Sequence, residues 1–171
     1  MTRTGSLFST SALVLAAATT LLAQAPKQPP SPAQGIRNQF GYINQKILEM
    51  AKDFPEDKYE FKLKDEMRSF RELIVHILSG NVYATKIGKG EKAQWDEVDA
   101  KLYPSKAAAV EAMEKSITEA TAVLKGLSDD RFKETLAPWL SVIEHSAEHY
   151  GLLVAYYRAN GLVPPESRPK K

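Results

Sequence analysis

The sequence predicts an all-α protein folded as a single antiparallel four-helix bundle. Four stretches of comparable length place apolar residues at alternating steps of three and four, which is the period of one helix face. Serine, proline or glycine stands at most ends of these stretches, where helices begin and end. No stretch alternates apolar and polar residues in the manner of a half-buried strand.

The first predicted helix spans residues 33–53. Pro55 ends it, because proline disfavours helical backbone in the residue before it. Its apolar stripe consists of Ile36, Phe40, Ile43, Ile47 and Met50.

The second predicted helix spans residues 69–87. Ser69 followed by Glu72 is a capping-box pattern, and Gly88 and Gly90 close the helix. Residues 88–104 then form a long polar connection that contains Trp95. A connection of this length fits either a crossover between distant helix ends or a lid, and the sequence leaves both open.

The third predicted helix spans residues 105–127 and starts at Ser105. The fourth spans residues 137–160, with a start expected near Pro138, because proline is tolerated in a first helical turn. Gly161 supplies its C-terminal stop, and two prolines follow shortly after.

The N-terminal region differs in character from the rest of the chain. Residues 1–25 carry one charge, Arg3, before an apolar stretch and a small-x-small ending, which predicts a signal peptide and a periplasmic or secreted protein. An uncleaved N-terminal anchor is the alternative, although the apolar run is short for a membrane span. Residues 26–34 form a Pro-rich linker, and residues 35–168 form the predicted bundle domain.

Composition excludes several classes of function. The chain has 171 residues and a formal net charge of +2, with basic and acidic residues interleaved, so no nucleic-acid-binding face is expected. Cysteine is absent, which excludes disulfides, thiolate nucleophiles and iron–sulfur clusters. No stable membrane span is expected after signal cleavage.

The three histidines are the candidate metal ligands. His145 and His149 stand four residues apart, within an apolar stripe of the fourth predicted helix, so both rings project inward from one face. His76 on the second helix is the remaining histidine. We expect the nearest ring nitrogens to lie roughly 3–4.5 Å apart if the three share one ion. The simpler interpretation is three half-buried histidines, each satisfied by an ordinary hydrogen bond.

Two glutamates are candidates for supporting roles. Glu148 could be a metal ligand, an acceptor that orients a ligand, or a catalytic base, or it could be an ordinary solvated residue. Glu72 could accept a hydrogen bond from His76, although helix capping explains it equally well. The order of residues in HSAEH is not that of the HExxH zinc-protease signature.

Two segments resemble the DinB-like (damage-inducible) four-helix metalloproteins. The stretch WLSVIEHSAEHYGLLVAYYRANGLVPPESR, residues 139–168, is similar to the family's last helix, and MRSFRELIVHILSGN, residues 67–81, to its second. The resemblance covers about residues 35–168. It implies that His76, His145 and His149 are the metal ligands, in an up-down-down-up bundle that is frequently a homodimer.

The same resemblance implies a nickel, zinc, iron or manganese ion with water at its open positions. Some relatives are transferases or isomerases that use bacillithiol, mycothiol or glutathione. An export signal departs from this pattern, because such thiols reside mainly in the reducing cytosol. Two functions remain open: a metal-dependent hydrolase or transferase acting on a small substrate, or a non-catalytic metal-binding or stress-associated module.

Overall fold

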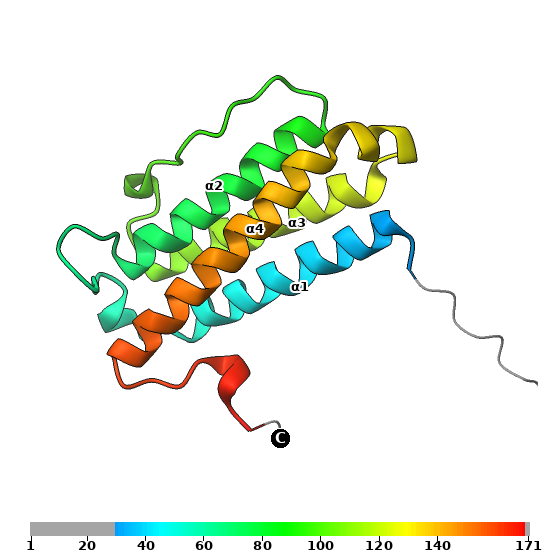
Figure 1. The fold of residues 1–171 in the computed structure, drawn as a ribbon. Coiled ribbons are helices and arrows are strands. Elements are labelled where there is room, and N and C mark those ends of the chain that lie inside the picture. The colour runs from blue at the N-terminus through cyan, green and yellow to red at the C-terminus, as the bar shows by residue number, and fades with distance from the viewer. Residues whose placement is uncertain (1–29, 170–171) are drawn as a thin grey trace, which may run out of the picture.

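The computed structural model describes residues 30–169, and these residues form an all-α four-helix bundle (Figure 1). The bundle consists of α1 (Pro32–Asp53), α2 (Phe70–Gly88), α3 (Lys106–Gly126) and α4 (Asp129–Ala159). Three short 3₁₀ turns lie outside it: η1 (Glu56–Lys58), η2 (Ala100–Leu102) and η3 (Pro165–Ser167). No strand occurs within residues 30–169, so the predicted fold class is confirmed.

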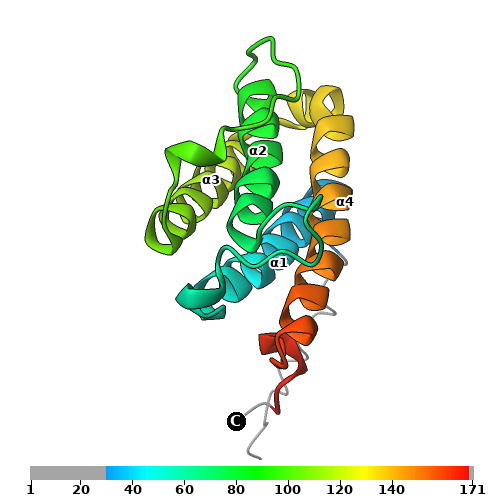
Figure 2. The same ribbon diagram turned by 90° about the vertical axis from the view of Figure 1, so that its left-hand side faces the viewer.

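The helices follow an up-down-down-up order. Helix α2 packs against α3 and α4, and α1 packs against the same two helices from the opposite side. Figures 1 and 2 show that α1 and α4 run in one direction and that α2 and α3 run in the other. The pair α2–α4 is therefore antiparallel. The pair α2–α3 is parallel, and residues 89–105 provide the crossover that this requires.

The first two helices begin where side chains satisfy free backbone N–H groups. Ser31 caps α1 through the N–H of Gln34, and Pro32 occupies its first turn, so residues 32–34 of the expected linker are helical. The capping box at α2 is confirmed: the N–H of Glu72 donates to Ser69 Oγ at 3.2 Å, and the N–H of Ser69 donates to the Glu72 carboxylate at 2.7 Å.

The predicted start of the fourth helix was wrong. Helix α4 begins at Asp129, and Pro138 lies inside it. Ser128 caps the N–H of Arg131, and two aspartates in the first turn interact favourably with the helix dipole. Pro138 cannot donate the usual backbone hydrogen bond to residue 134, and the first turns of α4 bend away from the rest of the helix (Figure 1).

The core has an aromatic cluster near each end of the bundle. Phe54 stacks on Phe70 with ring centroids 3.8 Å apart, and Tyr157 packs against both rings. At the other end, Phe40 meets the edge of Trp139 at 5.6 Å. All five side chains are buried, and each stabilises the fold by roughly 1.5–3 kcal/mol through burial alone.

No helix within residues 30–169 has both the length and the apolar character needed to cross a bilayer. The predicted signal peptide, residues 1–25, lies outside the described residues.

Candidate metal centre

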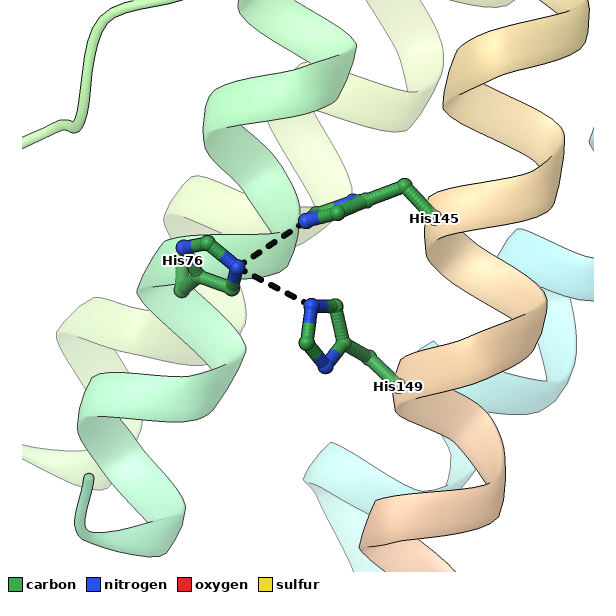
Figure 3. Close-up of side chains that lie close together, drawn as sticks. All are labelled: His76, His145 and His149. Carbon is green, nitrogen blue, oxygen red and sulfur yellow. Dashed lines mark hydrogen bonds between the residues drawn. The ribbon is translucent and has the colours of Figure 1, made fainter. Parts of the chain in front are cut away.

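The candidate site lies between the antiparallel helices α2 and α4. His76 projects from α2, and His145 and His149 project from successive turns of α4 toward it (Figure 3). The spacing of four residues places the two α4 rings on the same side of the helix. The sequence-based expectation that these three side chains converge is met.

The three rings meet through their Nε2 atoms. His76 Nε2 lies 3.0 Å from His145 Nε2 and 3.0 Å from His149 Nε2. The ring centroids of His145 and His149 are 4.4 Å apart. Each histidine offers one ring nitrogen, and these nitrogens lie within 4.8 Å of one another, so the group could hold a metal ion.

The protein environment favours neutral imidazoles on α4. Burial, followed by the nearby His149, His76 and Arg68, lowers the pKa of His145 to about 3. Burial, His76 and Arg68 also lower the pKa of His149, although Glu148 and Glu97 oppose that shift. Both rings therefore keep a free nitrogen lone pair at neutral pH, which is the form that binds metals.

A carboxylate from the crossover segment contacts His76. Glu97 Oε1 lies 2.6 Å from His76 Nδ1 but is not aligned for a hydrogen bond, and this nitrogen has no hydrogen-bond partner among residues 30–169. The same Glu97 oxygen accepts a hydrogen bond from Arg68 Nη2 at 3.3 Å. A backbone hydrogen bond anchors the segment next to this residue, because the N–H of Val98 donates to Ser79 Oγ on α2 at 3.0 Å.

Trp95 from the same segment packs beside His145. The two ring centroids are 4.8 Å apart, and the Tyr83 ring also packs against Trp95, with centroids 5.3 Å apart. Gly80 makes this packing possible: a Cβ atom there would come within 2.9 Å of Trp95 and 3.4 Å of His145 Nδ1. The long connection is therefore a crossover that also covers one side of the histidine cluster.

The two glutamates singled out in the sequence have other surroundings. Glu72 is engaged in the α2 capping box and does not contact His76 through any hydrogen bond among the described residues. Glu148 is exposed on α4, with no side-chain hydrogen bond or ion pair within residues 30–169. Glu97 and Trp95 were not predicted as site residues, because the irregular segment that carries them has no periodicity that indicates where it packs.

A cavity of about 530 Å³ adjoins the cluster at His149. Leu73 at the start of α2 and Leu152 on α4 line it, together with Arg68. The site thus has an open side toward the cavity and a side covered by the crossover segment.

The fold and the cluster define a class of protein: a four-helix bundle with three histidines gathered between two antiparallel helices. The family model of the DinB superfamily matches residues 39–156, which include all three histidines. The chain belongs to the DinB superfamily. No curated protein sequence matches this chain significantly.

Proposed function

We propose that this chain is an exported protein that binds one divalent transition metal through His76, His145 and His149 and acts as a metal-dependent hydrolase or transferase on a small substrate. The observation that carries the proposal is the convergence of three Nε2 atoms, two pairs of them at 3.0 Å. Zinc, nickel, iron and manganese all accept imidazole ligands, and the donor set does not choose among them.

The hydrogen-bonding capacity of the rings fits a metal better than it fits a ring-to-ring network. A carboxylate at His76 Nδ1 favours a proton on that atom and a lone pair on Nε2. One lone pair accepts two hydrogen bonds poorly, whereas a cation accepts all three lone pairs at once. Among residues 30–169 the buried His145 Nδ1 has no hydrogen-bond partner, so no hydrogen bond to this atom holds the ring.

The cavity beside His149 supports the catalytic form of the proposal. A metal held by three imidazoles supplies a Lewis acid with positions left for water or a substrate heteroatom. The alternative, a non-catalytic metal-binding or stress-associated module, is favoured by a site that side chains close completely. The cavity of about 530 Å³ beside His149 instead favours a site that binds a substrate.

The test is metal content. Purified protein loaded with each candidate metal and then dialysed should retain about one ion per chain. His76→Ala, His145→Ala and His149→Ala should each lower this occupancy sharply, because two imidazoles hold a divalent ion poorly. Glu148→Gln is the matched control and should keep its metal, since the Glu148 side chain is exposed. Full occupancy in all three histidine variants would refute the proposed site.

Export is proposed from residues 1–25 alone. Fractionation of the source cells followed by N-terminal sequencing should find a chain that begins near Pro26 outside the cytoplasm. A full-length cytosolic product would contradict export. It would also make a transferase that uses low-molecular-weight thiols compatible with the compartment. The homodimer implied by the family resemblance also stays a prediction, to be measured by light scattering.

A further inference from the structure

The cavity beside His149 has a lining that indicates what kind of molecule it accepts. Its lining includes three apolar side chains: Leu73 on α2, Leu152 on α4, and Met67 just before α2. Arg68 is the cationic residue of this lining, and Glu66 is its acidic residue. The lining therefore combines apolar side chains with one residue of each charge.

Arg68 is held in place by its backbone, while its side chain remains open to solvent. The Tyr156 hydroxyl donates to the Arg68 carbonyl, and the next residue, Ser69, is the N-cap of α2. The side chain is 49% exposed, and its hydrogen bond among the described residues goes to Glu97 at 3.3 Å. A guanidinium has five N–H donors, so donors remain for a second acceptor, and a carboxylate matches their fork geometry.

Electrostatics decide between an anionic and a cationic guest. Arg68 lines the same cavity as His149, and the Glu97 oxygen that it contacts at 3.3 Å lies 2.6 Å from His76 Nδ1. A metal held by the histidines would add positive charge on the same side of the cavity. Glu66 and Arg68 are both exposed, so water screens both of their charges. With a divalent metal on the histidines, positive charge is in excess beside the cavity, which favours an anionic guest over a cationic one.

We propose that Arg68 is the carboxylate-binding residue of this cavity and that the substrate is a small organic acid with an apolar body. Its carboxylate pairs with the guanidinium, and its apolar part packs on Met67, Leu73 and Leu152. The part of the substrate that reacts then faces the three histidines. This assignment rests on the proposed function, because it places the substrate beside the metal.

The test compares an acid with its uncharged amide by calorimetry. The probes are phenylacetate and phenylacetamide, titrated into the full-length protein loaded with zinc. The wild-type chain should bind the acid at least about tenfold more tightly, which is the usual size of a charge-assisted pair. Arg68→Gln should remove that preference, and Arg68→Lys should retain part of it. Arg158→Gln is the control, because this exposed arginine of α4 does not line the cavity.

Zinc content, measured on each protein before titration, separates the two proposals. Removing the positive charge of Arg68 should not weaken metal binding, so Arg68→Gln should stay loaded. If the chain takes up zinc but binds acid and amide equally, the carboxylate site is wrong and the metal centre stands. A preference that survives in Arg68→Gln means that the acid binds elsewhere, for example on the zinc, and also overturns the assignment. A wild-type chain that takes up none of zinc, nickel, iron and manganese refutes both proposals.

Discussion

At the scale of single residues, the cluster depends on a partner from a distant part of the chain. His76 faces its two α4 neighbours through Nε2 and faces the Glu97 carboxylate through Nδ1. A carboxylate beside the outer nitrogen of a metal-binding histidine orients its ring. Glu97 therefore has a defined role in the proposed metal centre without being one of its ligands.

Glu97→Gln should lower metal affinity by about 10–100-fold, since the side chain keeps its size but loses the charge that supports His76. The measurement is a competition titration against a chelator of known affinity. Asp96→Asn removes the same charge one residue away, on an exposed side chain, and should leave the affinity unchanged. Equal metal affinities for the two variants would mean that the contact between Glu97 and His76 does not contribute to metal binding.

The sequence predicts the histidines but not their surroundings. The spacing of His145 and His149 on one apolar face is a local signal, and the helical period alone determines that their rings point the same way. The position of Glu97 depends on long-range contacts such as the bond from Val98 to Ser79. No local pattern in an irregular segment carries that information, so this residue could not be found from the sequence.

At the scale of elements, helix ends with strong local chemistry were predictable, and the start of α4 was not. The capping box at Ser69 and the glycine at Gly161, which has a φ of 69°, fix their helix ends through interactions of adjacent residues. Pro138 was interpreted as a first-turn residue. The competing signal was the Ser128 cap with Phe132, whose buried side chain makes the early turns of α4 part of the core.

Two glycines within helices, Gly88 and Gly41, should respond in opposite ways to substitution by alanine. A Cβ at Gly88 would come within 2.5 Å of Val123 Cγ1 and 3.1 Å of the buried Trp139 ring, so Gly88→Ala should destabilise the fold by about 1–3 kcal/mol. At Gly41, within α1, such a Cβ would meet no atom within 4 Å among residues 30–169 other than the nearby backbone of its own helix. Gly41→Ala should stabilise the fold by roughly 0.5–1 kcal/mol, because alanine is the better helix former.

Urea unfolding of both variants checks this pair. The changes in the free energy of unfolding should have opposite signs. Because neither glycine has a positive φ, the difference comes from the space around each Cβ and not from backbone conformation. A stabilised Gly88→Ala variant would mean that α2 and α3 are packed less closely at this point than the structure has them.

At the scale of the whole molecule, the segment after α4 returns to the end of α1. Arg168 donates to both carboxylate oxygens of Asp53, at 2.8 and 2.5 Å, and the Tyr157 hydroxyl donates to the same carboxylate at 3.1 Å. The Arg168 hydrogen bond, with a smaller contribution from Tyr157, lowers the pKa of Asp53 below 3.8 although burial opposes the shift.

This ion pair predicts a pH dependence of stability. A carboxylate whose pKa is depressed in the folded state stabilises that state above its unfolded pKa, and the contribution disappears as pH falls through the folded pKa. Asp53→Asn should therefore unfold more easily than the wild-type chain at pH 7. The difference should shrink toward zero as the pH falls below 3.8. Denaturation midpoints measured across this range test it, and a difference that does not change with pH would contradict the role of the charge.

The topology explains why the candidate site lies where it does. Because α2 and α3 are parallel, the chain must return along the bundle between them, and that crossover carries Trp95 and Glu97 to the histidines. The site is thus assembled from α2, α4 and the crossover. The opposite side remains open at the cavity beside His149.

The most direct test of the metal centre is a crystal of the metal-loaded protein, with diffraction measured at the absorption edge of the bound metal. The account predicts a single anomalous peak between α2 and α4, about 2.0–2.3 Å from the Nε2 atoms of His76, His145 and His149. A strong peak held by other residues, or three histidine rings that point apart with no peak between them, would contradict it.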